Sequence, residues 1–431
     1  MKLYERLNKF LRKMESDPSI LINDVLLHER DKSDGAMFEH MLKGIRENRA
    51  LLDALLHILS TLPLKKYRRE EYFYLLIGAY AVMYLDRPDY AIVNEVVQLM
   101  KRRSPHRASA TNAILRRLAR EKDALIDKVL QEKPLPERLS MQFSVHLELT
   151  EMLLEQFSPE EVEAYYRFAQ KKPAFDLCVI HQSREEYKKE LSSNGVNSNL
   201  LSGTYAGLRI CKDSVDVASL PGFQEGSFYI MGHASQMLCE WVPHGERLLD
   251  LCAAPGGKSI CIKNRIPEIR LTSCDISQDR LITMKQNFRR VKIDADVYQL
   301  DGLEDHPAFH EKYDIVLLDA PCTSSGLLQR HADLRQRITR ERLEYNSAIQ
   351  KSLLRTASNY VKNQGFLIYS TCSILNQEGS LQIESFLRAN KSFSLYNPFN
   401  VAKSNAEKYF RTYPWLDECD GFFGAVMQRM R

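Results

Sequence analysis

The second half of the chain alternates short apolar runs with amphipathic stretches, and this alternation restricts the fold more than any other feature of the sequence. We predict strands at Arg247–Leu251, Arg270–Asp275, Asp296–Leu300, Tyr313–Leu318 and Gly365–Ser370. Helices are predicted near residues 257–265, 278–290, 340–361 and 378–389. Strands and helices in this order form right-handed crossover units. We therefore expect an α/β domain with a doubly wound, mostly parallel sheet.

Residues 1–135 have a different pattern, in which apolar side chains recur at intervals of three and four residues. The clearest runs are Leu51, Leu52, Leu55, Leu56 and Leu59, and then Tyr72, Leu75, Leu76, Ala79, Val82 and Met83. This spacing is typical of amphipathic helices, and Pro63, Pro88 and Pro105 mark breaks between them. The front of the chain is therefore predicted to be an all-helical bundle.

Residues 136–235 are predicted to form two linker helices and a small α/β module. The second linker helix begins at the capping box Ser158-Pro-Glu-Glu161. A strand over Phe175–Ile180, a helix that Ser183 caps, and a strand over Tyr205–Cys211 follow. The predicted domains are thus residues 1–135, 136–235 and 236–431.

The composition is that of a soluble globular protein. Hydrophobic residues make up 44% of the 431 residues and charged residues 27%, which argues against global disorder. No uninterrupted apolar stretch approaches the roughly 18 residues of a membrane helix. The charged N-terminus also lacks the apolar core of a secretory signal. We therefore expect a cytoplasmic protein with no membrane partner.

The nine cysteines are odd in number and show neither CxxC nor CxxH spacing. This pattern favours free thiols in a reducing compartment, and we expect no metal site. Six cysteines lie away from the motifs described below and are expected to be small buried hydrophobes. They are Cys178, Cys211, Cys239, Cys261, Cys274 and Cys419.

Positive charge is concentrated in the front of the chain. Residues 1–150 carry 26 Lys and Arg against 21 Asp and Glu, a net charge of +5, whereas the remaining residues carry 34 against 35, a net charge of −1. Seven basic residues that lie close together form what we call the basic cluster: Lys101, Arg102, Arg103, Arg107, Arg116, Arg117 and Arg120. This cluster favours a polyanionic partner, and the alternative is a solvated helix face.

The first strand of the predicted sheet runs into a loop of small residues that opens a helix. The loop consists of Cys252, Ala253, Ala254, Pro255, Gly256, Gly257 and Lys258. Small residues let the backbone approach a ligand, and the N–H groups of a helix N-terminus attract electronegative groups. The next two strands end near Asp275 and Asp301, which suit the ribose and the base of a nucleotide-like ligand. The loop lacks the GxGxxG pattern of NAD enzymes, and the alternative is a turn without a ligand.

Two cysteines follow the ends of later strands and are expected at the same edge of the sheet. Cys322 follows Asp319-Ala-Pro, and Cys372 follows Ser370-Thr. Such a pair suits methylation of cytosine at C5, because one thiolate adds to C6 while a second group removes the C5 proton. Asp319 is placed to hold the N3/N4 edge of the base. Buried packing is the alternative for each thiol.

Four motifs together resemble the RNA (cytosine-5) methyltransferases of the RsmB/Sun/Fmu type, which act on 16S rRNA. They are LDLCAAPGGK at 249–258, LLDAPCTSSG at 317–326, YSTCSI at 369–374 and Asp420-Gly-Phe-Phe423. AIVNEV at 91–96 and TNAILR at 111–116 resemble the NusB-like helical RNA-binding domain of those enzymes. The resemblance implies a NusB-like bundle, a small RRM-like module and a Rossmann-like class I methyltransferase domain.

The same resemblance implies the cofactor and the role of each site residue. S-adenosyl-L-methionine would be bound by residues 252–258 and by Asp275, Asp301 and Asp319. Cys372 would be the nucleophile, and Cys322 would assist proton removal and release. Small-subunit rRNA would be the partner and would contact the basic cluster. We expect a monomer.

The chain departs from the family pattern at three places outside the cofactor loop. Met231-Gly-His233 stands where a Gln-Asp pair is usual, Leu177-Cys-Val-Ile180 replaces Leu-Arg-Val-Asn, and Arg330-His-Ala-Asp333 replaces Arg-His-Pro-Asp. These departures bear on the RNA target more than on the reaction. Two alternatives therefore stay open: a tRNA cytosine-5 methyltransferase, and a non-catalytic RNA-binding or ribosome assembly factor that retains the fold.

Overall fold

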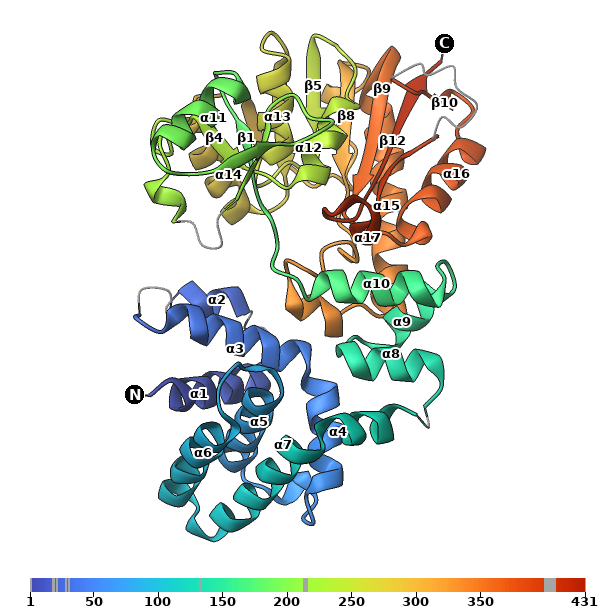
Figure 1. The fold of residues 1–431 in the computed structure, drawn as a ribbon. Helices are drawn as coiled ribbons and strands as arrows, with labels where there is room; N and C mark the ends of the chain where they lie inside the picture. The colour runs from blue at the N-terminus through green and yellow to red at the C-terminus, as the bar shows by residue number, and fades with distance from the viewer. Residues whose placement is uncertain are drawn as a thin grey trace. The chain divides into compact units, whose positions relative to one another are not determined.

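The structure, a computed structural model, describes residues 2–17, 20, 22–27, 29, 32–131, 133–211, 216–398 and 408–430. The chain forms two compact units (Figure 1). The helical unit consists of residues 1–170 and 330–339, and the α/β unit consists of residues 171–329 and 340–431. Within the described ranges, no helix combines the length and the apolar character that crossing a membrane requires.

The helical unit is built from helices, as the spacing of its apolar residues predicts. They are α1 (Leu3–Ser16), α2 (Ile22–Leu27), α3 (Gly35–Glu47), α4 (Arg49–Leu59), α5 (Arg69–Tyr84), α6 (Asp89–Arg103), α7 (Ala108–Leu130), α8 (Leu135–Phe143), α9 (Leu147–Leu154) and α10 (Pro159–Ala169), with the short 3-10 helices η1 (Leu64–Lys66) and η2 (Pro105–Arg107). At the start of α10, the Ser158 hydroxyl accepts the Glu161 N–H at 3.3 Å, so the predicted capping box forms.

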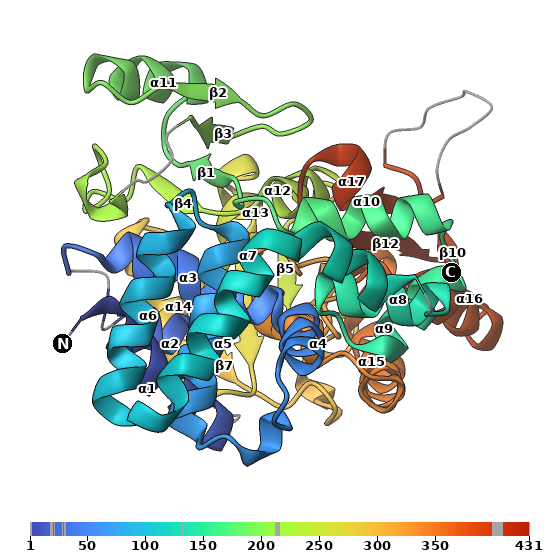
Figure 2. The ribbon, with the colours of Figure 1, turned by 60° about the horizontal axis from the view of Figure 1, so that its bottom comes forward.

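The centre of the helical unit is α5, which is apolar on almost every side. Leu75, Leu76 and Ile77 are consecutive and fully buried. A helix that is hydrophobic all round must be covered by others, and α1, α3, α4, α6 and α7 contact it. Figure 2 shows α5, α6 and α7 side by side. The bundle prediction is therefore confirmed.

A segment from the second half of the chain completes the helical unit. Residues 330–339 belong to it, although the chain before and after them belongs to the α/β unit. They include the short 3-10 helix η5 (Ala332–Gln336). The Asp333 carboxylate accepts hydrogen bonds from the N–H of Ile22 at 3.1 Å and from the Arg46 guanidinium at 2.8 Å. The altered motif that contains Asp333 thus has a structural part in the helical unit.

Replacing Arg335 by alanine is expected to destabilise the helical unit by about 3 kcal/mol, the scale of a broken buried polar network. Arg335 is fully buried and donates to the carbonyls of Phe143 and Ala169, at 3.2 and 2.8 Å. Alanine leaves both carbonyls without their donor and opens a cavity. Urea unfolding measures the change, with the exposed Arg138→Ala as the matched control. A loss below about 1 kcal/mol would contradict this account of the segment.

The α/β unit begins with the predicted small module. Its elements are β1 (Phe175–Val179), α11 (Arg184–Ser193), β2 (Ser198–Leu200), β3 (Gly207–Ile210), η3 (Val217–Ser219) and β4 (Phe228–Ile230). The strands are antiparallel in the order β2-β3-β1-β4, and α11 lies beside β2 (Figure 2). The Ser183 hydroxyl accepts the Glu186 N–H at 3.1 Å and starts α11 as predicted. The strands β2 and β4 were not predicted.

The cysteines expected to be buried hydrophobes are buried, with one exception. Cys211 is exposed, so that prediction is wrong for it. Cys211 follows the last residue of β3 rather than standing within the strand, and its Sγ lies 3.2 Å from the Asn199 amide nitrogen. A position just past a strand end leaves the side chain at the margin of the sheet.

The large sheet of the α/β unit has the predicted doubly wound arrangement. Its parallel strands are β5 (Arg247–Asp250), β6 (Arg270–Asp275), β7 (Asp296–Gln299), β8 (Tyr313–Asp319) and β9 (Val361–Thr371). Three further strands, β10 (Phe393–Leu395), β11 (Phe410–Thr412) and β12 (Phe422–Arg429), were not predicted. The order is β10-β12-β9-β8-β5-β6-β7, with β11 paired to β12, which runs antiparallel to β9.

Helices cover both faces of this sheet (Figure 1). They are α12 (His233–Glu240), α13 (Gly257–Arg265), α14 (Gln278–Arg290), α15 (Arg340–Tyr360) and α16 (Ser380–Ala389), with the short η4 (Pro307–Phe309), η6 (Asn376–Glu378) and α17 (Pro414–Asp417). Successive strand residues enter opposite cores: Leu248 packs with Ile260 of α13, whereas Leu249 packs with Leu354 of α15. The side chains of β5 thus alternate between the two helical layers.

Candidate functional site

The site lies where the strand order of the large sheet reverses. β5 pairs with β6 on one side and with β8 on the other, so the chain leaves these strands toward opposite sides. Doubly wound sheets form a crevice at such a point. The loop 252–258 follows β5, and Asp319 and Cys322 follow β8. Because β9 pairs in parallel with β8, Cys372 also reaches this edge.

The small-residue loop is packed so closely that glycine is required in it. Gly256 has a φ of +100°, and a Cβ there would lie 2.7 Å from the ring of Phe288. A Cβ on Gly257 would lie 3.0 Å from the ring of Tyr229. Gly257 is the first residue of α13, so the loop delivers the chain directly into a helix N-terminus.

Asp275, at the end of β6, is tied to the loop. Its carboxylate accepts the N–H of Ala254 at 3.2 Å and the N–H of Ser277 at 3.0 Å. Arg280 lies 3.4 Å from the same carboxylate and also donates to the carbonyl of Ala254. The sequence analysis missed Arg280, which holds the loop and Asp275 together.

Two exposed apolar side chains stand beside the acidic strand ends. Ile276 is 59% exposed and follows Asp275 directly. Leu303 is 45% exposed, and its N–H donates to the Asp301 carboxylate at 2.9 Å. Large apolar side chains exposed at a strand-end crevice suit a flat apolar ligand group. The sequence analysis missed both, although each comes one or two residues after a predicted acid.

Asp250, the last residue of β5, was also missed. It is 1% exposed, and one carboxylate oxygen accepts the Ser259 hydroxyl at 2.7 Å. The other oxygen, Oδ1, is buried and has no hydrogen-bond partner among the described residues. Burial raises the pKa of Asp250 to about 7. A buried acceptor without a donor marks a place for a cationic or hydrogen-bonding group.

Lys258 connects the loop to the end of β8. Its Nζ lies 2.6 Å from the Asp319 carboxylate and 5.1 Å from the ring centroid of Phe422, in the Asp-Gly-Phe-Phe motif. Burial opposes the charge of Lys258, but the Asp319 carboxylate outweighs burial and raises the Lys258 pKa. The Ser370 hydroxyl donates to the other Asp319 oxygen at 2.7 Å. Asp319 is thus fixed from two sides.

The structure brings the two predicted thiols together. The Sγ atoms of Cys322 and Cys372 lie 3.3 Å apart, and both residues are partly exposed. Backbone hydrogen bonds join the two loops, from Ala320 to Ser370 at 2.9 Å and from Gly326 to Cys372 at 3.0 Å. Within the described residues, no group of His, Cys, Asp and Glu side chains is arranged to hold a metal ion.

The two thiols differ in their surroundings. The hydrogen bond with Cys372, together with burial, raises the pKa of Cys322 well above its ordinary value. A thiol with a raised pKa stays protonated at neutral pH. The Cys372 Sγ lies 3.4 Å from the Ser324 hydroxyl. The arrangement therefore suits proton handling by Cys322 better than nucleophilic attack by it.

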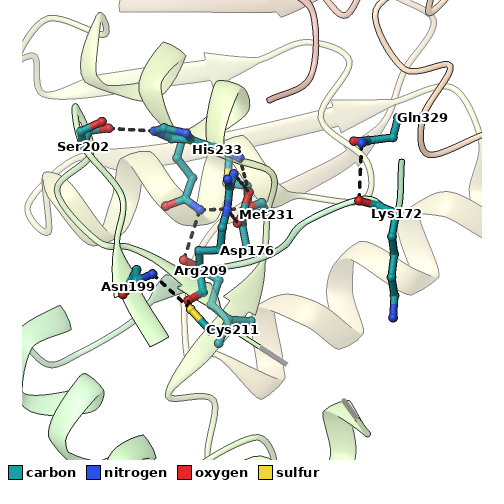
Figure 3. Close-up of polar contacts among 11 residues, drawn as sticks. Lys172, Asp176, Asn199, Ser202, Arg209, Cys211, Met231, His233 and Gln329 are labelled. Carbon is teal, nitrogen blue, oxygen red and sulfur yellow. Dashed lines mark hydrogen bonds and ion pairs between the residues drawn. The ribbon is translucent and has the colours of Figure 1, made fainter. Parts of the chain in front are cut away.

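The start of α12 shows how the chain tolerates its departure at Met231-Gly-His233. Asp176 of β1 accepts the N–H of His233 at 3.2 Å and pairs with Arg209 of β3 at 2.7 Å (Figure 3). The Gln236 amide donates to the carbonyl of Met231 at 2.7 Å. A carboxylate from a distant strand thus satisfies the helix N-terminus where the local sequence offers glycine.

The basic cluster lies in the helical unit, on α6, η2 and α7. Acidic neighbours pair with four of its members: Arg103, Arg107, Arg117 and Arg120. Lys101, Arg102 and Arg116 are exposed and form no ion pair with another described residue. Arg107 is half-buried, lying 3.8 Å from Glu71 and over the ring of Tyr67. RNA contact by the cluster stays a prediction.

Family models match both ends of the chain. Residues 241–428 match 16S rRNA methyltransferase RsmB/F, and residues 7–120 match the NusB family. The chain is 30% identical to ribosomal RNA small subunit methyltransferase B of Proteus mirabilis (strain HI4320), over 92% of this chain and 90% of that protein. It is 28% identical to the protein of the same name from Klebsiella pneumoniae (strain 342), over 92% and 91%.

Solved structures share the fold. PH0851 superposes with a TM-score of 0.73 at 23% identity, covering 93% of this chain and 92% of that one. NSun6 from Pyrococcus horikoshii with SFG superposes with a TM-score of 0.58 at 20% identity, covering 66% and 98%. The predicted fold class and family resemblance are both confirmed. This chain belongs to the RsmB/F family of 16S rRNA methyltransferases.

Proposed function

We propose that this protein transfers a methyl group from S-adenosyl-L-methionine to C5 of a cytosine in 16S rRNA through a covalent cysteine–C6 adduct. The observation that carries the proposal is the 3.3 Å separation of the Cys322 and Cys372 sulfurs at the edge that holds the glycine loop. Transfer to C5 needs a nucleophilic thiolate and a second proton-handling group beside it. The names of the relatives support rRNA as the substrate class.

The residues around β5 fit S-adenosyl-L-methionine. The orphan Oδ1 of Asp250 suits a cationic amino group, Asp275 and Asp301 suit the ribose and base, and Ile276 with Leu303 suits the adenine ring. Residues 252–258 supply the close backbone approach. When bound, the cofactor supplies an electrophilic methyl group on sulfur. A neighbour in fold contains SFG, an analogue of this cofactor.

In the proposed reaction the protein first activates the pyrimidine. The Cys372 thiolate forms a bond to C6, and Lys258 and Asp319 stabilise the base at its N3/N4 edge. The electron pair displaced toward C5 then takes the methyl group. The proton that C5 still carries must leave before the C6–sulfur bond breaks. Cys322 is placed to take it as a thiolate, after giving its own proton to solvent. Loss of the proton and of Cys372 restores the aromatic base.

The basic cluster would bind the RNA outside the reacting nucleotide. Lys101, Arg102 and Arg116 are its exposed members without an intramolecular ion pair among the described residues, so they keep their charge free for phosphate. A cytosine in a folded RNA must leave its stack to reach Cys372. The helical unit and the small α/β module would hold the RNA during that step.

Transfer of tritium from labelled S-adenosyl-L-methionine tests the proposal against both alternatives. We expect label in 5-methylcytosine of 16S rRNA, with tRNA unlabelled. Label in tRNA alone would favour the tRNA enzyme. Cofactor binding without transfer to either RNA, or to precursor particles of the small subunit, would favour the assembly factor and overturn the proposed activity.

Affinity for S-adenosyl-L-methionine is expected to fall as the pH drops below about 7, the pKa of Asp250. The cationic cofactor favours the ionised carboxylate, so binding must release a proton wherever the free protein holds one. The limiting slope is roughly tenfold per pH unit. Isothermal titration at pH 6, 7 and 8 measures this dependence.

The variant Asp250→Asn is expected to bind the cofactor weakly and without this pH dependence, and the exposed Asp279→Asn is the control. The folding stability of the cofactor-free protein has the opposite pH dependence. The pKa of Asp250 is ordinary in the unfolded chain and raised in the folded protein, so the neutral carboxyl group favours the folded state. Stability of the free protein is therefore lost as the pH rises through about 7. Cofactor affinity that is flat between pH 6 and 8 would contradict the role of Asp250.

A further inference from the structure

A buried carboxylate lies between the two cysteine loops. Glu378, at the end of η6, is 0% exposed. One of its carboxylate oxygens accepts the N–H of Thr323 at 2.8 Å and the Gln350 amide at 3.1 Å. The other oxygen accepts the Thr323 hydroxyl. The side chain of Glu378 thus accepts two hydrogen bonds from Thr323, the residue that directly follows Cys322.

The backbone of Glu378 binds the chain that leads into Cys372. Its carbonyl accepts the Tyr369 hydroxyl at 2.8 Å and the Thr371 hydroxyl at 3.2 Å. Thr371 directly precedes Cys372 in the chain. A single residue therefore joins the chain next to one thiol to the chain next to the other.

The two thiols depend on this residue to different degrees. The chain that leads into Cys372 is also held on both sides, because β9 pairs with β8 and with β12, where Phe423 stands opposite Thr371. On the Cys322 side, both donors of Thr323 end on the Glu378 carboxylate. Loss of that carboxylate should therefore displace Cys322 before it displaces Cys372.

A buried carboxylate is costly, which argues for a specific role. Burial raises the pKa of Glu378, and hydrogen bonds from Ser373, Thr323 and Gln350 offset the cost of its charge. The same charge adds to the raised pKa of Cys322, and a thiolate of raised pKa is a stronger base for the C5 proton once it forms. An apolar residue of similar size would fill the space without aligning the Cys322 loop.

We propose that Glu378 is a positioning residue for Cys322, holding its thiol beside Cys372 for removal of the C5 proton and release of the product. This inference rests on the proposed function. The inference predicts that Glu378 is needed for release of the methylated product and not for formation of the adduct between Cys372 and C6.

The test is Glu378→Gln, incubated with 16S rRNA and S-adenosyl-L-methionine and resolved on a denaturing gel. Glutamine keeps an oxygen for the Thr323 N–H and the Gln350 amide, but it removes the charge and places an NH2 donor against the Thr323 hydroxyl, which must turn to accept. The expected result is a denaturant-resistant protein–RNA band, with turnover at least tenfold lower and the rate of band formation within twofold of Cys322→Ala. Glu384→Gln, the same change at an exposed position of α16, should behave as wild type.

Two results would overturn the proposal. Turnover by Glu378→Gln at the wild-type rate would show that Cys322 does not depend on this carboxylate, and loss of the band together with turnover in a folded variant would place the effect on Cys372.

Thr323→Val, which removes one bond to Glu378, should give a weaker band and makes the same test if Glu378→Gln loses the native circular dichroism. Absence of a band from Cys322→Ala itself would overturn the proposed function, and this inference with it.

Discussion

Replacement of Cys372 by serine or alanine is expected to abolish methyl transfer and to leave binding of S-adenosyl-L-methionine intact. The reason is chemical, because C5 of cytosine becomes nucleophilic only after a thiolate adds to C6, and a hydroxyl or a methyl group cannot take that place. The expected loss is at least about 10³-fold in turnover. Methyl transfer to 16S rRNA measures the activity, and titration calorimetry measures cofactor binding.

The matched control for this substitution is Cys211→Ser, which changes an exposed thiol outside the site. It should retain full activity. Methylation by Cys372→Ala above a hundredth of the wild-type rate would contradict the assignment of the nucleophile. Loss of cofactor binding in the same variant would place Cys372 in the cofactor pocket instead.

Replacement of Cys322 by alanine is expected to stop the reaction after the first half. The adduct between Cys372 and the pyrimidine should form, accept the methyl group and then persist, because the C5 proton is not removed. The observable product is a protein–RNA complex that survives denaturation, at close to one RNA per protein. The raised pKa of Cys322 is consistent with this assignment, since a protonated thiol is a poor nucleophile.

The double variant Cys322→Ala with Cys372→Ala is the control for the trapped complex, and it should form none. A complex that persists in the double variant would mean that another nucleophile attacks the RNA. Rapid turnover by Cys322→Ala alone would mean that solvent or another base removes the proton, and Cys322 would then be a packing residue.

Much of the fold was predictable because its signals are local. The parallel strands β5 to β9 are short apolar runs flanked by helical patterns, and each was predicted to within a few residues. The helical unit was predictable for the same reason. By contrast, β12 pairs with β9 across about sixty residues of chain, and β10 and β11 are only three residues long, so no local pattern distinguishes them.

The position of residues 330–339 was not predictable from periodicity. The segment is short and polar, and its buried Arg335 reads in the sequence as a surface residue. Its burial is explained by the carbonyls of Phe143 and Ala169, which lie 192 and 166 residues earlier in the chain. The role of Asp176 was also not predictable. Asp176 lies within β1, and nothing in the sequence indicates that its carboxylate accepts the His233 N–H at the start of α12.

Site residues were predictable where a sequence motif follows the end of a strand. They were not predictable where a buried side chain only holds another site residue in place. Cys322, Cys372 and the loop 252–258 were placed by the rule that parallel strands share a carboxyl edge. Asp250 and Glu378 were missed because each lies in an apolar or mixed run where an acid is easily taken for a solvated residue. Their burial and their partners become visible only in three dimensions.

Bisulfite sequencing of 16S rRNA from cells with and without this gene shows whether the protein methylates a cytosine at C5. We expect that one cytosine resists conversion in cells with the gene, becomes fully convertible without it, and regains resistance with the wild-type gene but not with Cys372→Ala. An unchanged pattern of resistant cytosines after loss of the gene would contradict C5 methylation of 16S rRNA by this protein.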